Sequence, residues 1–78
     1  MREVLFPQVS GNRPLISDGV VSTWFVADGE RVERDQLIAE VQVDKATAEV
    51  RSPDTGTIRL LVSEGVEVSE QAPIARIE

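Results

Sequence analysis

The chain has 78 residues, fourteen acidic against eight basic, and a net charge of −6, which supports one small domain and argues against nucleic acid or an anionic membrane surface as partner. It has no cysteine and no histidine, which removes thiolate nucleophiles, the commonest general base and the usual metal ligands, so we expect no metal and no catalysis of its own. No apolar run approaches the roughly 20 residues of a membrane-spanning helix.

Short apolar alternations, interrupted at short intervals by Gly and Pro, predict an all-β domain without helices. Many short strands with regular turns are typical of a sandwich or barrel. In chain order, strands are expected near 2–6, 19–26, 36–43, 46–51, 56–62 and 73–78, with two shorter ones near 31–33 and 67–69.

The chain also repeats itself. Residues 26–42, moved by 36 positions, overlay residues 62–78 with five identities in seventeen, and Ile38 and Ile74 interrupt the polar face at the same place in both copies. Upstream, 19–26 is similar to 56–62, with one residue fewer in the second copy. Because each copy alone would expose an apolar face, the repeat predicts two similar halves packed together.

Between the strands 36–43 and 46–51 lie only Asp44 and Lys45, and Lys45 is the one lysine of the chain. Two residues form the shortest hairpin loop, and Asp and Lys suit a type I turn. Most exposed lysines are solvated surface charges. A unique lysine at a hairpin tip favours an attachment site instead, at which a second enzyme with an activated acyl donor would act. This pattern indicates a carrier rather than a catalyst.

The stretch "DKA" followed by "TAEVRSPDTGTI" resembles the lipoyl domains of 2-oxo acid dehydrogenase complexes. In that family, glycines lie sixteen residues before and eleven residues after the modified lysine, which are the positions of Gly29 and Gly56. The resemblance covers essentially the whole chain, and further matching positions are Pro7, Trp24, Val26, Asp28, Glu49, Ser52, Pro53, Glu64, Gly65, Ile74, Ile77 and Glu78. The end of a strand at Val43, directly before the "DKA", matches the family as well, although the residue type there does not.

Three positions depart from the family pattern. Gln42 and Val43 stand where the family often has Glu and Thr, and Arg34 replaces a usual glycine. None of these positions belongs to the lysine turn itself. They leave open whether the complex acts on pyruvate, a branched-chain acid or 2-oxoglutarate.

The resemblance implies a flattened barrel, or sandwich, of two four-stranded antiparallel sheets related by a pseudo-twofold axis. It implies lipoate joined to Lys45 by an amide bond, with Asp44 and Ala46 flanking the turn. Gly29 and Gly56 would form framing turns, and Glu49 would belong to the same site. The single domain 1–78 is then expected to be the N-terminal part of a longer dihydrolipoamide acyltransferase.

The implied partners are a thiamin-dependent decarboxylase, the acyltransferase core, dihydrolipoamide dehydrogenase, and a lipoate ligase or a lipoyl or octanoyl transferase. The loop 7–14 resembles one that helps the decarboxylase to recognise its own domain. The domain itself is expected to be monomeric, in the cytoplasm of a bacterium or in the mitochondrial matrix of a eukaryote.

Three alternatives stay open. A biotin carrier has a similar fold but bears "MKM" at the tip, where this chain has Asp44, Lys45 and Ala46. The carrier of the glycine-cleavage system also bears lipoate but is a longer chain with extra helices. The third alternative is a structural or protein-binding β-sandwich in which Lys45 is never modified.

Overall fold

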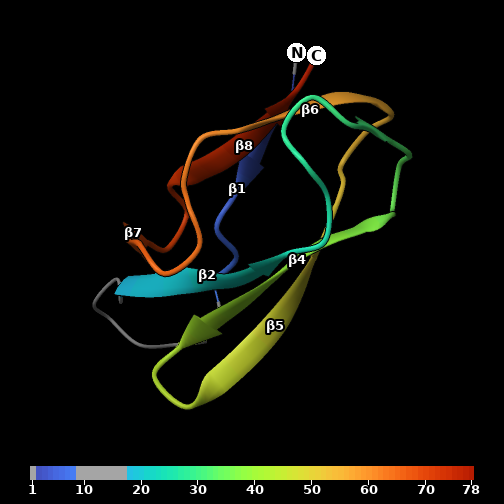
Figure 1. The fold of residues 1–78 in the computed structure, drawn as a ribbon. Helices are drawn as coiled ribbons and strands as arrows, with labels where there is room; N and C mark the ends of the chain where they lie inside the picture. The colour runs from blue at the N-terminus through green and yellow to red at the C-terminus, as the bar shows by residue number, and fades with distance from the viewer. Residues whose placement is uncertain (1, 9–17) are drawn as a thin grey trace.

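The computed structural model describes residues 2–8 and 18–78, which form two four-stranded antiparallel sheets packed face to face (Figure 1). One sheet has the strand order β1-β8-β6-β3 and the other β5-β4-β2-β7. The expected all-β sandwich is therefore confirmed, and no helix able to cross a membrane occurs in the described part of the chain. The strands are β1 (Arg2–Leu5), β2 (Asp18–Trp24), β3 (Arg31–Val32), β4 (Leu37–Val43), β5 (Ala46–Arg51), β6 (Gly56–Leu60), β7 (Glu67–Ser69) and β8 (Pro73–Ile77).

The hydrophobic core lies between the two sheets. Because side chains alternate across a strand, every second residue of each strand faces the other sheet. Val41 and Val43 of β4 and Ile58 of β6 follow this rule and are buried. The aliphatic core is dominated by β-branched residues, which suit the pleated surface of a sheet.

The predicted repeat is present in space as a pseudo-twofold relation between the halves. Asp28 and Glu64, which are 36 positions apart, each accept a hydrogen bond from the other half: Leu60 N donates to Asp28 Oδ1 at 2.9 Å, and Trp24 N donates to Glu64 Oε2 at 2.7 Å. The left-handed backbone positions repeat too, with Gly29 matched by Gly65 and Asp35 by Gln71. Each half therefore completes the turns of the other.

Two β-bulges explain why the alternation breaks at Ile38 and Ile74. The register of β4 against β5 shifts between Leu37 and Ala39, and that of β8 against β1 shifts between Pro73 and Ala75. The extra residue in each case is the isoleucine. A bulge turns two consecutive side chains toward the same side, and Ile38 and Ile74 are each fully buried beside a buried alanine.

A third bulge accounts for the extra residue of the first copy. Val21 pairs with Val41 and Thr23 pairs with Glu40, so Ser22 has no partner across the ladder. Its hydroxyl donates to the carbonyl of Glu40 at 3.0 Å. The corresponding pairing of β6 with β8 runs without a shift, so the insertion is absorbed in β2 without disturbing the pseudo-symmetry.

The chain ends and the β4–β5 turn lie at opposite ends of the molecule (Figure 1). Arg2 pairs with Ile77, so the two ends of the described chain are neighbours in one sheet. Under the pseudo-twofold relation, β4 and β5 correspond to β8 and β1. The lysine turn, which connects β4 to β5, therefore lies at the place where, in the other half, the corresponding strands β8 and β1 end and begin without a connection.

Candidate functional site

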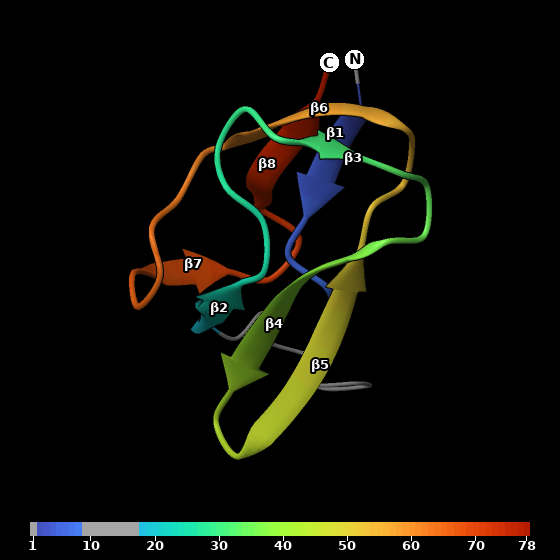
Figure 2. The same cartoon turned by 45° about the vertical axis from the view of Figure 1, so that its right-hand side comes forward.

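The β4–β5 hairpin projects from the body of the sandwich (Figure 2), and Lys45 belongs to the loop at its tip. The two strands pair from Leu37 with Arg51 up to Val43 with Ala46, which leaves only Asp44 and Lys45 in the loop. Asp44, Lys45 and Ala46 are all exposed. The strand pairing on both sides holds the lysine at a defined position, while its amine reaches into solvent.

The turn differs from the predicted type I. Asp44 has a φ of 54°, and Lys45 does not have a positive φ. A type I turn needs a negative φ at its first loop residue, so this turn is not type I. The physical reason is the right-handed twist of the strands, which the primed turns match and type I does not. Aspartate tolerates the left-handed region better than most residues, where the usual cost is roughly 1–2 kcal/mol.

Gln42 is the residue of this site that the sequence prediction missed. Its side-chain Nε2 donates to the main-chain carbonyl of Asp44 at 3.2 Å. Gln42 is exposed on the outer face of β4, two residues before the turn. Its only signal in the sequence was its departure from the family's usual glutamate, which says nothing about the hydrogen bond.

Glu49 does not lie at the turn. It pairs with Glu40, three residue pairs beyond the Val43–Ala46 pair, which is about 10 Å along the strand. Its Oε1 is 3.3 Å from Arg51 Nη2, and both side chains are more than half exposed. The predicted membership of Glu49 in the site therefore stays a prediction, and any role would be on the outer face of the hairpin.

The two framing glycines have different local structures. Gly29 lies in a turn with a φ of 86°, and its N–H donates to Ile58 O at 2.7 Å. Gly56 does not form a turn: it is the buried first residue of β6 and pairs with Val32. A Cβ at Gly56 would overlap Glu78 O and lie 2.8 Å from Ile77 Cγ2, so close packing, not turn geometry, requires this glycine. Its contacts lie by the chain ends, remote from Lys45.

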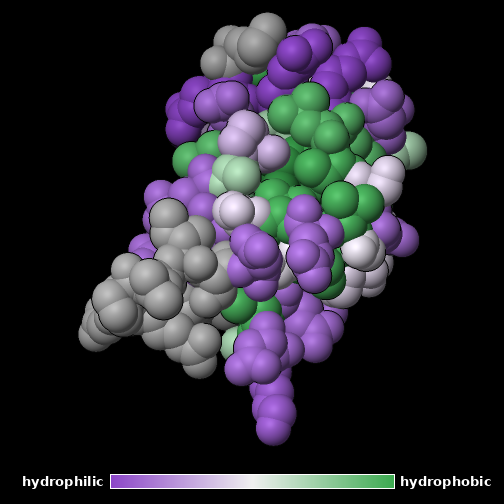
Figure 3. Space-filling model, turned by 90° about the vertical axis from the view of Figure 1, so that its left-hand side faces the viewer, coloured by the Kyte–Doolittle hydropathy of each residue, from purple (hydrophilic) through white to green (hydrophobic). Residues whose placement is uncertain are grey.

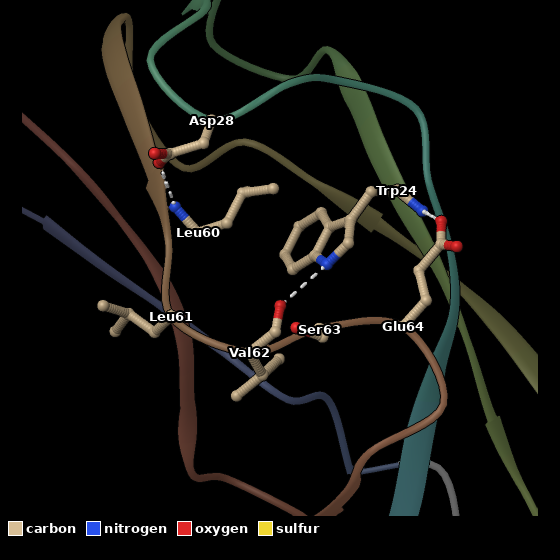
Figure 4. Close-up of a pocket in the computed structure, with 7 residues that line it drawn as sticks. All are labelled: Trp24, Asp28, Leu60, Leu61, Val62, Ser63 and Glu64. Carbon is tan, nitrogen blue, oxygen red and sulfur yellow. Dashed lines mark hydrogen bonds between the residues drawn. The ribbon is translucent and has the colours of Figure 1, made fainter.

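An open hollow of about 570 Å³ lies where the two halves meet, lined in part by Trp24 and the segment 60–64 (Figure 4). Three of the polar side chains that line it make hydrogen bonds within the protein. Asp28 and Glu64 accept the two main-chain hydrogen bonds described above, and Trp24 Nε1 donates to Val62 O at 3.1 Å. Trp24 packs against the core. The hollow is therefore a structural junction.

Apolar side chains gather on one face above the hydrophilic protruding end (Figure 3). The large apolar side chains that remain exposed include Leu5, Leu61 and Val66. Leu5 pairs with Pro73, and Leu61 N donates to Ile74 O at 2.9 Å, so these two leucines flank the start of β8. This face is separate from the lysine turn.

Most of the loop 7–14 lies outside the described residues, so its suggested part in recognition stays a prediction. Residues 2–8 and 18–78 contain no group of three or more carboxylates that could hold a metal ion. What this part of the chain presents is an amine on a rigid hairpin. Such a site suits the carrying of a covalently attached group.

The comparisons with known proteins agree with this class. The family model described as "Biotin-requiring enzyme", for biotin and lipoyl attachment, matches residues 3–77. The chain therefore belongs to the family of biotin and lipoyl attachment domains, whose members carry biotin or lipoate on a lysine.

Three relatives illustrate the similarity. The chain is 41% identical over 75 residues to the pyruvate dehydrogenase E1 component subunit beta of Rhizobium meliloti (strain 1021), which covers 94% of this chain and 16% of the relative. It is 38% identical over 60 residues to the dihydrolipoyllysine-residue acetyltransferase component of the pyruvate dehydrogenase complex of the same organism. This match covers 72% of this chain and 13% of the relative. It is 41% identical over 64 residues to the lipoamide acyltransferase component of the branched-chain alpha-keto acid dehydrogenase complex of Bacillus subtilis (strain 168). This match covers 82% of this chain and 14% of the relative. The chain thus spans less than a fifth of the length of these relatives.

Proposed function

We propose that this chain is a lipoyl carrier domain of a 2-oxo acid dehydrogenase complex, with lipoate attached to Lys45. The observation that carries the proposal is the exposed single lysine at the tip of the two-residue β4–β5 turn. The names of the relatives support it, since all three are components of pyruvate or branched-chain acid dehydrogenases.

The residues around Lys45 fit an attached acyl group. Within residues 2–8 and 18–78, no ion pair or hydrogen bond ties up the lysine amine. The neighbouring Ala46 is small, so the amine is accessible to a modifying enzyme. In the attachment, Lys45 Nζ forms an amide bond to the carboxyl carbon, the amine loses a proton, and the activating group leaves. The partner, a lipoate ligase or a lipoyl or octanoyl transferase, would supply the base that this chain lacks.

Attached to Lys45, lipoate would supply a dithiolane for acyl transfer and thiol–disulfide exchange, and the partner enzymes would be a thiamin-dependent decarboxylase, the acyltransferase core and dihydrolipoamide dehydrogenase. The contribution of this chain is to position the attached group. Its hairpin holds Lys45 at one end of a rigid body, and tethering raises the effective concentration of the carried group at each active site. The absence of cysteine agrees with a chain that positions the cofactor and takes no part in the sulfur chemistry, because the sulfur comes with the cofactor.

Two kinds of longer chain are candidate hosts. The resemblance predicts that the domain is the N-terminal part of an acyltransferase, and two of the relatives above are acyltransferases. The Rhizobium relative that covers 94% of this chain is a pyruvate dehydrogenase E1 component subunit beta, which makes such a subunit a second candidate. In either host the domain would serve a 2-oxo acid dehydrogenase complex, in a bacterial cytoplasm or a mitochondrial matrix.

Intact-mass measurement tests the proposal. The purified domain is incubated with lipoate ligase, ATP and lipoate, and in parallel with biotin ligase, ATP and biotin. We expect a gain of one lipoyl group and its loss in the Lys45→Arg variant, which keeps the charge but not the acylated amine.

A folded domain that gains no lipoyl group would contradict the proposal. A gain with biotin ligase alone would support the biotin carrier. Because Lys45 is the only lysine, the α-amine is the only competing amine. Mapping the modified peptide separates these two sites.

A further inference from the structure

The two sheets of the sandwich carry opposite charges. The strands of the sheet β1-β8-β6-β3 hold four arginines and one glutamate, a net charge of +3, although the whole chain has a net charge of −6. The strands of the sheet β5-β4-β2-β7, which includes the lysine hairpin, hold four carboxylates and one arginine, a net charge of −3. The sheet that contains the chain ends is therefore a basic sheet in an acidic domain.

Three of these arginines lie on the outer face of the basic sheet. Arg31, Arg59 and Arg76 each adjoin a buried residue of their strand. Because side chains alternate along a strand, the three arginines point away from the core. Arg59 and Arg76 pair across β6 and β8, and their side chains are 46% and 43% exposed. The outer face therefore presents guanidinium groups side by side.

The carboxylates near these arginines do not use up their positive charge. Glu78 is shared between two of them, since its Oε1 lies 3.2 Å from Arg59 Nε and its Oε2 lies 3.4 Å from Arg76 Nη2. Within residues 2–8 and 18–78, neither Arg31 nor Glu3 forms an ion pair, although Glu3 is the cross-strand neighbour of Arg76. Arg76 Nε is buried without an acceptor in the same part of the chain. This face therefore has guanidinium groups available for a further carboxylate.

Two leucines continue this outer face beyond the arginines. Leu61 follows Arg59 by two residues, and its N–H extends the ladder to β8 by donating to Ile74 O at 2.9 Å, so Leu61 and Arg59 lie on the same side. Leu5 of β1 pairs with Pro73. The two leucines are 46% (Leu5) and 47% (Leu61) exposed. The apolar area in Figure 3 is bordered by hydrophilic side chains toward both ends of the molecule.

The other half of the domain shows that the fold does not require this charge. Positions 36 residues apart are equivalent in the two halves, so Arg31 corresponds to Glu67 and Arg76 corresponds to Glu40. Glu40 and Glu67 also adjoin buried residues of their strands and face outward. The same places thus accept a carboxylate in one sheet and a guanidinium in the other. The sign of the charge is set by something other than the fold.

We propose that the outer face of the basic sheet docks an acidic protein segment that carries apolar side chains next to its carboxylates. The apolar side chains would cover Leu5 and Leu61, while the carboxylates would pair with the planar guanidinium groups, whose donors match a carboxylate. A nucleic acid offers no such apolar group for the leucines. The acidic sheet on the opposite face repels the segment, and charges more than about 8 Å away are largely screened at physiological salt, so each face acts separately. Docking here leaves the lysine turn exposed.

Titration of the ¹⁵N-labelled domain with synthetic peptides, followed by NMR amide shifts, tests the proposal. The probe is the capped peptide Leu-Ser-Glu-Ser-Leu-Ser-Glu, whose leucines and glutamates share one face of an extended chain. Two comparison peptides replace Glu by Lys or Leu by Ala. We expect the probe to shift the amides of β1, β6 and β8, and the comparison peptides to bind about tenfold more weakly.

Matched variants of the domain locate the contact. Leu61→Ser should weaken binding of the probe about tenfold, whereas Phe25→Ser, at the equivalent position of the other half and 51% exposed, should leave it within about twofold. Arg59→Gln should weaken binding about two- to fivefold. Arg51→Gln is its control, because Arg51 is 54% exposed and lies on the acidic sheet. Circular dichroism checks that all variants are folded.

Each other outcome counts against the proposal. Equal binding of the Glu and Lys peptides would remove the role of charge, and equal binding of the Ala peptide would remove the role of the leucines. Shifts confined to β4 and β5, or no shift at millimolar peptide, would refute the docking surface. No step of the test uses lipoate or Lys45, so its result is independent of the proposed function.

Discussion

At the scale of single residues, two glycines are required by close packing at equivalent places in the two halves. A Cβ at Gly19 would lie 2.6 Å from Gln42 O and 2.5 Å from Phe6 Cζ, and one at Gly56 would overlap Glu78 O. Both sites oppose a main-chain carbonyl, which cannot move away as a flexible side chain can. The glycine of the family frame at position 56 is therefore explained by packing near the chain ends, and not by any contact with Lys45.

We expect Gly56→Ala to lower the free energy of unfolding by about 2–3 kcal/mol, the usual upper range for an added group in a packed interior. Urea unfolding followed by Trp24 fluorescence measures this change. Gly65→Ala is the matched control, because no atom lies within 4 Å of its Cβ position and only its φ of 81° is unfavourable. Its cost should be roughly 1–2 kcal/mol. Equal stability of Gly56→Ala and the parent would contradict the packing argument.

At the scale of the elements, the β-bulges decide how the strands fill the core. A regular β4 would place Ile38 on the outer face, since Ala39 and Val41 face inward. The bulges at Ile38 and Ile74 turn both isoleucines into the core instead, where each is fully buried. In each half, Phe25 N or Leu61 N donates to the carbonyl of the bulged isoleucine at 2.9 Å, which satisfies the locally disrupted ladder.

Ile38→Ala and Ile74→Ala should each destabilise the domain by about 2–5 kcal/mol, because each leaves a cavity beside its bulge. The two costs should agree within about 1 kcal/mol, since the environments are pseudo-equivalent. Val66→Ala, at a half-exposed position, should change stability by no more than about 0.5 kcal/mol. Denaturant titration of the three variants provides the measurement, and a cost below 1 kcal/mol at either isoleucine would show that it is not a core residue.

At the scale of the whole molecule, the pseudo-twofold relation separates the lysine turn from the chain ends. The ends of β1 and β8 pair side by side, whereas the equivalent strands of the other half are joined by the turn that bears Lys45 (Figure 1). A longer polypeptide would thus enter and leave the domain at the end remote from Lys45. This geometry leaves the hairpin tip free to approach the active sites of partner enzymes.

The pairing of the ends also predicts that the domain tolerates circular permutation. Residue 78 would be joined to residue 1 by roughly six Gly and Ser residues, with new ends opened between Asp44 and Lys45. We expect a cooperatively folded domain whose free energy of unfolding lies within about 2 kcal/mol of the parent. Circular dichroism and urea unfolding test the fold.

The permuted domain should also lose lipoylation, because its lysine no longer lies in a closed turn. An unfolded permutant would show that the connected hairpin is needed to hold the halves together. Lipoylation at the parent rate would instead show that the turn has no part in recognition.

The sequence by itself determined the strand positions, the two similar halves and the lysine turn. These features depend on the local alternation of apolar and polar residues, on identical residues 36 positions apart and on the spacing of glycines around Lys45. All three can be read along the chain. Even the breaks in the alternation at Ile38 and Ile74 were visible there, although their cause was not.

Only the tertiary structure decided the turn conformation, the bulges, the packing role of Gly56 and the hydrogen bond from Gln42 to Asp44. The twist of paired strands selects a primed turn over type I, and this twist belongs to the sheet rather than to Asp44 or Lys45. Likewise, a bulge or a close backbone contact exists only once two strands distant in the sequence have come together. That is why the place of Lys45 followed from the sequence, whereas the orientation of its turn followed from the packed sheets.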